Sequence, residues 1–290
     1  MTTLAICNHK GGTGKTTTVV HTAAALGLSG YRTLVIDLDP QGFLTRYLGI
    51  AEPPIEASSL MLFDHQVKLR DVPVQRLKHF DVLPASASMT KVLRKLTRPT
   101  DVFWAKEALQ TGPDYEFVVF DTAAAVTAYS LNALVASRFA LIPVTPEYQP
   151  VYGAEQTYQT IRQVREKLNP DLQAPFFLFT QVDGRKRSHH QYRRYLRARY
   201  GDLVMRSIIR TSTALSQAYD DGTTAFEHAP TSRGVRDYAN ATDELLRHVR
   251  AGTPRPVPEI NGVEPPAYGE EPAYGEEQSR PVAPERPAWL

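Results

Sequence analysis

The chain has 290 residues, of which 22% are charged, and its formal net charge at pH 7 is +2. This length fits two small domains or one α/β domain followed by a tail. No apolar run approaches the roughly 20 residues that a membrane helix needs, and no charged and apolar leader precedes the first expected strand. The composition argues against membrane-spanning and secreted proteins, so we expect a cytoplasmic protein.

The charge is distributed unevenly along the chain. Residues 251–290 contain three arginines and seven glutamates, a net charge of −4, so residues 1–250 carry +6. The same tail is rich in proline and repeats Pro-Ala-Tyr-Gly-Glu-Glu at 266–271 and 272–277. Such a composition cannot bury enough apolar surface to offset the entropy of ordering. We predict one folded domain over residues 1–250 and a disordered Pro/Glu-rich tail over residues 251–290.

Residues 4–17 carry the most informative pattern. Residues 4–7 are a short, continuously apolar run, which fits a strand buried on both faces and makes Cys7 a core residue. Lys15 adds a positive charge and Thr16 a hydroxyl ligand for Mg²⁺. Between the apolar run and Lys15 lie glycines whose backbone N–H groups can surround phosphate oxygens at the positive end of a helix: Gly11, Gly12 and Gly14. The pattern predicts a site for the phosphates of a nucleotide.

Acidic residues follow two further expected strands. Residues 15–29 continue as a helix, and the next buried strand, over residues 33–37, runs into Asp37 and Asp39. A later strand over residues 116–121 ends in Asp121. Carboxylates at the carboxyl ends of parallel strands point into the crevice where nucleotides bind. We therefore expect all three carboxylates beside the phosphates.

The remaining elements alternate in the same manner. They are a short helix over residues 59–63, a strand over 79–83, a helix over 86–96, a strand and its exit over 139–146, a helix over 151–168, a strand over 175–180, a helix over about 188–200 and an amphipathic closing helix over 233–250. Strand and helix thus recur from residue 3 to about residue 209. This order predicts an α/β fold with a doubly wound, mostly parallel sheet and helices on both faces.

Residues 185–210 are strongly basic, with nine arginine and lysine residues against one acid, Asp202. On a helix over about 188–200, Arg193 and Arg197 would lie one turn apart on the outside. The core-facing side would consist of Tyr192, Tyr195, Leu196 and Tyr200. One interpretation is a solvated helix in a chain that generally uses arginine in place of lysine. The other is a patch that contacts phosphates without reading bases.

The run Lys-Gly-Gly-Thr-Gly-Lys-Thr-Thr at residues 10–17 resembles the deviant Walker A loop of the ParA/MinD family of dimerising ATPases. The resemblance covers residues 3 to about 250 and implies a P-loop NTPase fold with ATP and Mg²⁺ as cofactors. It implies that Lys10 reaches the partner subunit's nucleotide, that Lys15 acts in its own subunit, and that Asp39 positions the attacking water. Thr16, Asp37 and Asp121 would hold the metal. The nucleotide would contact Gly11, Gly12, Thr13, Gly14, Lys15, Thr16, Thr17, Gln181 and Asp183, the last two near the base.

Within that family the chain looks like a ParA/Soj-type partition ATPase. The resemblance implies a nucleoid-associated homodimer that forms with ATP, binds nonspecific double-stranded DNA, hydrolyses ATP slowly, and segregates chromosomes or plasmids with a stimulating ParB-like partner. Two arginines that such proteins often carry are here Ala214 and Glu227. We therefore predict DNA contacts at Arg185, Arg187, Arg193, Arg197, Arg210 and Arg233. The tail lacks the basic amphipathic helix with which MinD-type relatives hold membranes, so no membrane partner is expected.

One segment departs from the family pattern. Thr-Ala-Ala-Ala stands at residues 122–125, where prolines usually follow the aspartate, which puts the coupling of this segment to hydrolysis in question. Two alternative functions share the fold. One is a switch that positions a protein cargo, and the other is a bacterial tyrosine kinase, whose tyrosine-rich tail is represented here only by Tyr268 and Tyr274.

Overall fold

The computed structural model describes residues 1–64, 66–93, 96 and 98–251. Eight strands form one sheet in the order β3-β4-β2-β5-β1-β6-β7-β8, and every neighbouring pair is parallel except the edge pair β3-β4. The strands are β1 (Thr2–Ile6), β2 (Thr33–Asp37), β3 (Gln75–Arg76), β4 (Asp81–Leu83), β5 (Phe117–Asp121), β6 (Phe139–Val144), β7 (Phe176–Val182) and β8 (Val204–Arg210). The predicted doubly wound, mostly parallel sheet is confirmed, with β1 near its centre.

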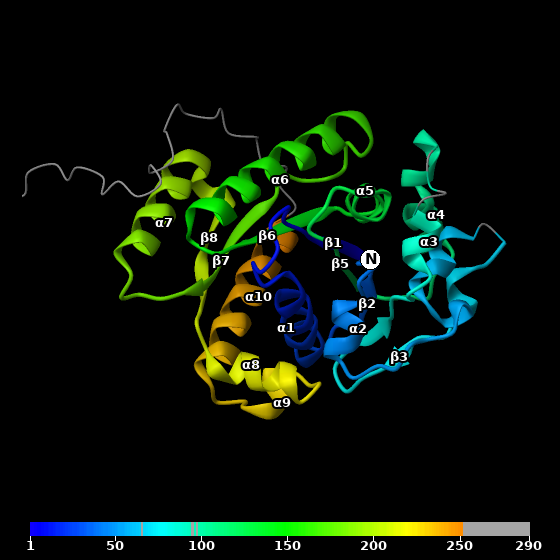
Figure 1. Cartoon of the computed structure of the whole chain (residues 1–290), viewed down its shortest axis with the longest axis horizontal. Helices are drawn as coiled ribbons and strands as arrows, with labels where there is room; N and C mark the ends of the chain where they lie inside the picture. The colour runs from blue at the N-terminus through cyan, green and yellow to red at the C-terminus, as the bar shows by residue number, and fades with distance from the viewer. Residues whose placement is uncertain (65, 94–95, 97, 252–290) are drawn as a thin grey trace, which may run out of the picture.

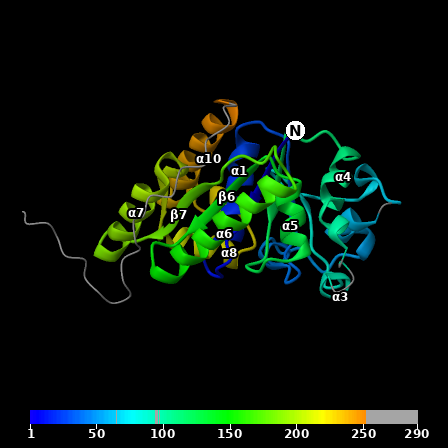
Figure 2. The same cartoon turned by 90° about the horizontal axis from the view of Figure 1, so that it is seen from above.

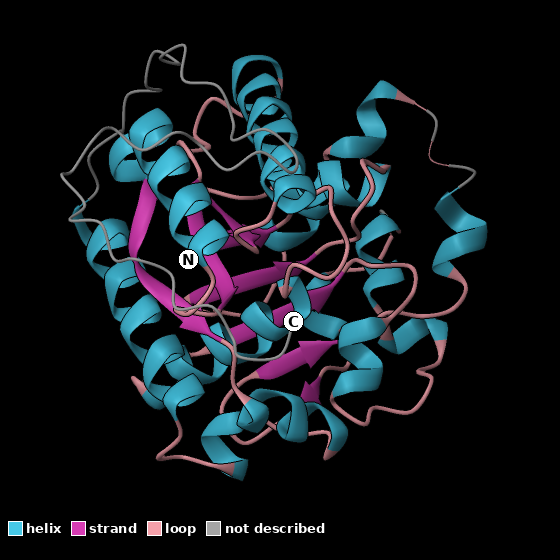
Figure 3. Ribbon diagram, turned by 60° about the vertical axis from the view of Figure 1, so that its left-hand side comes forward, coloured by secondary structure: helices cyan, strands magenta, loops and turns pink. Residues whose placement is uncertain are grey.

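Helices cover both faces of this sheet, as Figure 1, Figure 2 and Figure 3 show from three directions. On one face lie α1 (Lys15–Leu28) and α10 (Arg233–Ala251), and on the other α5 (Ala128–Val135), α6 (Tyr148–Lys167) and α7 (Arg187–Tyr200). The shorter helices are α2 (Phe43–Tyr47), α3 (Met89–Leu93), α4 (Trp104–Gln110), α8 (Thr213–Asp220) and α9 (Ala225–His228). Among the described residues, no helix has the length and apolar character needed to cross a membrane.

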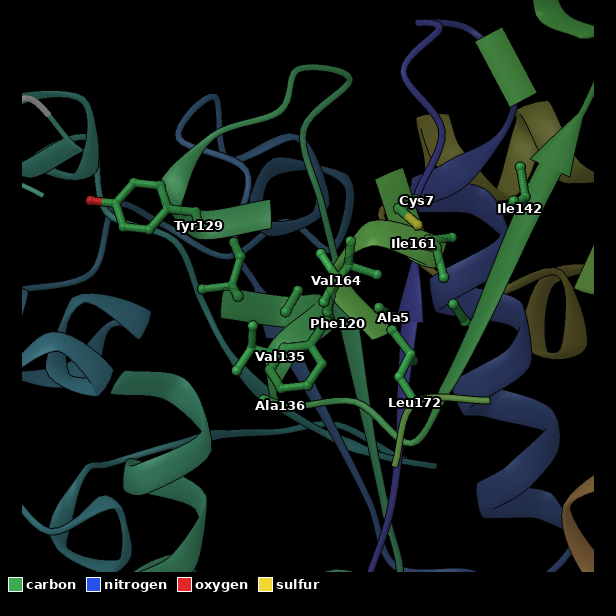
Figure 4. Close-up of a cluster of buried hydrophobic side chains, with 14 of the residues drawn as sticks. Ala5, Cys7, Phe120, Tyr129, Val135, Ala136, Ile142, Ile161, Val164 and Leu172 are labelled. Atoms are coloured by element: carbon green, nitrogen blue, oxygen red, sulfur yellow. The ribbon is translucent and has the colours of Figure 1, made fainter. Parts of the chain in front are cut away.

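Alternate residues of the central strands enter two hydrophobic layers. Ala5 and Cys7 pack toward α5 and α6, whereas Leu4 and Ile6 pack toward α1 and α10. Figure 4 shows part of the first layer, in which the strand residues lie among Val135 of α5, Ala136 directly after it, and Ile161 and Val164 of α6. Burial raises the pKa of the Cys7 thiol to about 12, so the thiol stays protonated. The prediction of a core role for Cys7 is confirmed.

Several predicted boundaries differ from those observed. The helix expected over residues 86–96 is only α3, because Ser86 Oγ and the Ala87 backbone N–H both donate to Glu52 and hold the chain out of a helix before Met89. The strand expected over residues 79–83 begins at Asp81. The short elements α2, α4, α5, α8, α9 and β3 were not predicted. The predicted disordered tail lies, except for residue 251, outside the described residues.

The closing helix α10 packs on the edge strand β8 and accepts hydrogen bonds from its backbone. Its predicted apolar stripe is largely buried, with Val235, Tyr238, Leu245 and Leu246 in the core. Its carboxylates accept hydrogen bonds from β8: Glu244 takes the backbone N–H groups of residues 206 and 207, and Asp237 takes that of residue 210. These carboxylates therefore occupy backbone donors that an edge strand would otherwise leave unpaired.

The stability of the fold depends on pH through the ionisation of His21 on α1. The ring is buried, with Nδ1 2.7 Å from the Thr17 carbonyl oxygen, and Nε2 accepts the Ala225 backbone N–H at 3.0 Å. This arrangement requires a neutral ring protonated on Nδ1, and burial lowers the pKa of His21 to about 4. The resulting stability is present above the unfolded pKa of about 6.5 and is lost as pH falls toward the folded value.

As the pH falls from 7 to 5, we expect protonation of His21 to lower the unfolding free energy of the wild type by about 2 kcal/mol. The His21→Gln variant should lack this loss, although it is less stable at neutral pH. Burial raises the pKa of Asp37 to about 6, which opposes the trend equally in both proteins. The difference between their urea unfolding curves at the two pH values therefore isolates His21, and equal changes would contradict the assignment.

Candidate functional site

In the loop between β1 and α1, the backbone at the glycines is exposed and the residue in the middle, Thr13, is held in place. Gly12 and Gly14 have φ angles of +75° and +79°, a region that favours glycine. A Cβ at Gly11 or Gly12 would meet no atom within 4 Å, so the backbone there faces open space. Thr13 is buried, and its carbonyl oxygen accepts a hydrogen bond from Thr180 Oγ1 at 2.8 Å. The loop is thus held to β7 while its glycines leave room for phosphate oxygens at the start of α1.

The two lysines of the loop differ in exposure. Lys15 Nζ donates to the Lys10 carbonyl oxygen at 3.1 Å. Burial lowers the pKa of Lys15, while Asp121 and Asp39 act in the opposite direction. The Lys10 side chain is exposed, and within the described part of the chain its amine makes no hydrogen bond or salt bridge. Only Lys15 is therefore held inside its own phosphate loop.

Helix α6 fixes the backbone at Lys10. The Lys10 backbone N–H donates to Asn8 Oδ1 at 2.9 Å, and the His9 backbone N–H donates to Thr157 Oγ1 at 2.9 Å. A Cβ at Gly153 would lie 3.0 Å from Lys10 Cβ and 3.3 Å from Asn8 Oδ1. Gly153 and Thr157 could not be predicted from the sequence, because a contact between a helix and a loop so distant in sequence leaves no local pattern.

The contact at Gly153 predicts that Gly153→Ala changes stability and ATP turnover in opposite directions. In Gly153→Ala, alanine favours the helix by up to about 1 kcal/mol. The same methyl group displaces Lys10, and we expect ATP turnover to fall roughly tenfold. Thermal unfolding and phosphate release measure the two effects. Gly184→Ala is the matched control, since a Cβ there meets nothing within 4 Å. Unchanged turnover in Gly153→Ala would show that the Lys10 backbone position does not matter.

Asp37 and Asp121 end neighbouring strands in register, so the structure brings the predicted carboxylates together. Asp121 is buried, and its Oδ2 accepts a hydrogen bond from Thr16 Oγ1 at 2.8 Å. Its Oδ1 is buried without a hydrogen-bond partner among the described residues. Burial, Asp37 and Asp39 all raise the pKa of Asp121 well above its usual range. Three carboxylates thus converge, and among the described residues Lys15 supplies the positive charge that acts on Asp121.

Asp37 and Asp39 have different surroundings. Asp37 Oδ2 accepts both the backbone N–H and the hydroxyl of Thr45, and Oδ1 accepts the Asp39 backbone N–H at 3.1 Å. The carboxylate of Asp37 is therefore committed to shaping the turn after β2, and its predicted contact with the metal stays a prediction. Asp39 Oδ1 accepts the Gln41 backbone N–H at 2.9 Å, which leaves Oδ2 for a further donor.

The residues present fit a hydrated Mg²⁺ ion. A hydroxyl oxygen and a carboxylate oxygen lie at the start of α1, and the buried Oδ1 of Asp121 lacks the partner that a buried polar atom normally has. Oxygen donors of this type suit Mg²⁺, which keeps several of its waters. A divalent cation would also relieve the carboxylate repulsion that raises the pKa of Asp121.

A cavity of about 330 Å³ adjoins the phosphate loop. Gln181 lines it, and this residue has an unusual positive φ of +52°. Its Nε2 donates to the Gly12 carbonyl oxygen at 2.7 Å. The rest of the lining comes from the loop, α1, β7, β8, the turn after it, α8 and α10: Gly14, Thr17, Thr180, Ile209, Arg210, Thr211, Ser212, Leu215, Ser216, Tyr219, Asp220 and Tyr238. Its position beside the loop suits the nucleoside part of a nucleotide.

Asp183 does not line this cavity. Its carboxylate forms a two-pronged salt bridge with Arg185, with distances of 3.0 and 2.8 Å, and the hydrogen bond from Arg185 lowers the pKa of Asp183. Of the two residues predicted to lie near the base, the structure therefore places Gln181 at the cavity and Asp183 in an ion pair outside it. The nucleotide contact of Asp183 stays a prediction.

A second and larger cavity, of about 1260 Å³, lies between α7, β8 and α10. Its arginines, which we call the arginine cluster, are Arg193, Arg197, Arg206 and Arg247. The first two were among the predicted DNA contacts, and the remaining two were missed because they come from other elements. The predicted inward face of α7 is confirmed, since Tyr192, Tyr195, Leu196 and Tyr200 are all buried.

The other predicted DNA contacts lie elsewhere. Arg185 pairs with Asp183, and Arg210 pairs with Asp237 on α10 and lines the cavity beside the phosphate loop. Arg187 and Arg233 are exposed at the beginnings of α7 and α10. The six arginines thus do not line one cavity, and their contact with DNA stays a prediction.

Comparisons with known proteins agree with this geometry. A family described as an AAA domain matches residues 1–174. The chromosome-partitioning ATPase Soj of Thermus thermophilus is 34% identical over 252 residues, which cover 85% of this chain and 96% of that protein. The sporulation initiation inhibitor protein Soj of Bacillus subtilis is 31% identical over 247 residues, with coverages of 83% and 97%.

Solved structures show the same fold. Cobyrinic acid a,c-diamide synthase from Mycobacterium smegmatis, with a bound ATP analog and magnesium, has a TM-score of 0.74 and is 28% identical, covering 89% of this chain and 100% of that one. That protein binds an ATP analog and magnesium, and the oxygen donors of Thr16 and Asp121 fit a magnesium ion here. The phosphate loop, the converging carboxylates and the two Soj relatives together show that the chain belongs to the ParA/Soj family of partition ATPases.

Proposed function

We propose that the chain is a dimerising switch that binds nonspecific DNA in its ATP state and segregates chromosomes or plasmids with a ParB-like partner. The observation that supports this most directly is the contrast between its two loop lysines. Lys15 is held in its own phosphate loop, whereas the amine of Lys10 is exposed beside it. An exposed lysine there can reach the nucleotide of a second subunit, so each site would be complete only in a homodimer.

In this proposal the chain's own groups divide the work of ATP hydrolysis. Lys15 and the loop N–H groups stabilise negative charge on the phosphates in cis, and Lys10 adds charge in trans. Mg²⁺, when bound, neutralises and orients the phosphates, with Thr16 as its direct ligand and Asp121 holding its water shell. Asp39 Oδ2 orients the attacking water. Turnover is slow in the monomer because the charge of Lys10 is absent from the site.

The arginine cluster supports DNA as the polyanionic partner. Its residues come from α7, β8 and α10 and line one open cavity, and Arg193 and Arg197 lie one turn apart on the same helix. Contacts of this kind bind phosphates and read no sequence. The protein would accordingly be cytoplasmic and associated with the nucleoid through its ATP-bound dimer.

The test is binding to random-sequence duplex DNA with Mg·ATP, with Mg·ADP or without nucleotide. We expect tight binding only with ATP, and a steep fall in affinity between about 50 and 200 mM salt. Replacing Arg193 and Arg197 by glutamine removes two arginines from each subunit and should reduce the salt slope by about 4 per dimer, because each phosphate contact contributes roughly 1. Arg162→Gln is the control, because Arg162 pairs with Glu166 on the surface of α6.

Two outcomes would reject parts of this proposal. ATP-dependent dimers that bind no DNA in any nucleotide state would reject the DNA partner and favour a switch that positions a protein cargo. An unchanged salt slope in the double variant, with DNA binding intact, would reject the arginine cluster as the contact surface.

A further inference from the structure

The arginine cluster carries more positive charge than its surroundings balance. Among the described residues, no salt bridge involves Arg193, Arg197, Arg206 or Arg247. Two carboxylates, those of Asp202 and Glu244, also line the cavity, and both oxygens of Glu244 accept backbone N–H groups of β8, so the four arginines still outnumber the acids. Partial burial and the neighbouring Arg197 both lower the pKa of Arg193. The cavity therefore favours an anionic occupant.

The chain itself leads from this cavity into an acidic segment. Arg247 and His248 line the cavity, and α10 ends one turn later at Ala251. Residues 252–290 contain seven glutamates and three arginines. Glu259 follows Ala251 by eight residues, a stretch that spans at most about 28 Å. Of the six later glutamates, five lie in or just before the tandem repeats and are called the repeat-region glutamates: Glu264, Glu270, Glu271, Glu276 and Glu277.

We infer that the acidic tail occupies the arginine cluster of its own chain and competes there with DNA. The competition rests on the proposed function, whereas occupancy of the cavity by the tail does not. The tail is the occupant that charge complementarity and chain connectivity select together. It is covalently joined to a cavity-lining helix, so its effective concentration at the cavity is on the order of millimolar.

The contact between the tail and the arginine cluster is suited to regulation because each of its arginine–glutamate pairs is weak. Exposed pairs of arginine and glutamate contribute little individually and are screened by salt. DNA presents one phosphate charge per about 1.7 Å of helix axis, a far denser anion than the tail. The tail would therefore exclude weak or transient polyanions and yield to DNA when an ATP-bound dimer offers two clusters at once.

Chemical labelling of arginine tests occupancy without DNA. The full chain is compared with a full-length variant in which the five repeat-region glutamates are replaced by glutamine. Phenylglyoxal modification is followed by mass spectrometry at low salt and at about 1 M salt, where the Debye length is near 3 Å. We expect Arg193 and Arg247 to react several-fold faster in the variant at low salt only, while the exposed Arg233 reacts equally in both. Equal rates at Arg193 and Arg247 would overturn the inference.

Binding to random-sequence DNA then tests competition. With Mg·ATP at low salt, we expect the glutamine variant to bind about five to ten times more tightly than the wild type, a difference that high salt removes. Equal affinities despite a labelling difference would refute competition. Absence of DNA binding in both proteins would refute the proposed function and the competition with it, while the labelling result would still decide whether the tail occupies the cavity.

Discussion

Replacing Lys10 by alanine is expected to leave Mg·ATP binding nearly unchanged and to lower dimer-linked turnover by about three orders of magnitude, the typical effect of a charge supplied in trans. The physical reason is position. In the proposed mechanism Lys15 neutralises phosphates in its own loop, and the exposed amine of Lys10 makes no bond among the described residues that its loss could break. The Lys10 backbone, which accepts the Lys15 amine, remains in the variant.

Nucleotide affinity and phosphate release, measured over a range of protein concentrations, separate the two steps. Lys186→Ala is the matched control, because Lys186 is a partly exposed lysine that pairs with Glu147 at 3.8 Å and lies outside the loop. Normal turnover in Lys10→Ala would reject the trans mechanism. A large loss of ATP affinity would instead place Lys10 in its own subunit's site.

The phosphate loop and the carboxylates could be predicted because their information is local. A strand, three glycines, a lysine and threonines are contiguous in sequence, and strand direction alone places Asp37 and Asp121 at one edge of a parallel sheet. The structure adds that Asp37 is committed to Thr45, a hydrogen bond between residues eight positions apart around a turn. No pattern in strand β2 distinguishes that role from metal binding.

The arginine cluster and the α6 contact could not be predicted from sequence. Arg193 and Arg197 are visible as a helical pair, but Arg206 and Arg247 join them only when β8 and α10 meet at the sheet edge. Gly153 is similarly an ordinary helical glycine until α6 packs on the loop that holds Lys10. Both features depend on tertiary packing between distant elements, and no periodic pattern in a single sequence reveals such packing.

Asp121→Asn is expected to lower Mg·ATP turnover strongly while stabilising the metal-free protein. In the wild type this buried carboxylate lies beside Asp37 and Asp39, and burial and those charges raise its pKa. A raised pKa contributes stability that is present below the unfolded value of about 3.9 and is lost as pH rises through the folded value. Asparagine carries no charge to repel its neighbours, so the variant lacks this loss.

At pH 8 with chelator, we expect the variant's melting temperature to exceed that of the wild type by at least about 2–4 °C, the shift that 1 kcal/mol gives in a domain of this size. The difference should narrow toward about pH 4, where the wild-type carboxyl is protonated. Mg·ATP turnover should fall at least about a hundredfold, because the water shell of Mg²⁺ loses its carboxylate. Asp171→Asn, at an exposed position, is the control.

A variant that is inactive and less stable than the wild type at pH 8 would mean that the Thr16 hydrogen bond, which asparagine keeps only with its carbonyl oxygen, outweighs the repulsion among the carboxylates. A variant that keeps its turnover would remove Asp121 from the metal site. The expected combination, greater stability with no activity, identifies a residue whose charge destabilises the fold and is retained for the cation it holds.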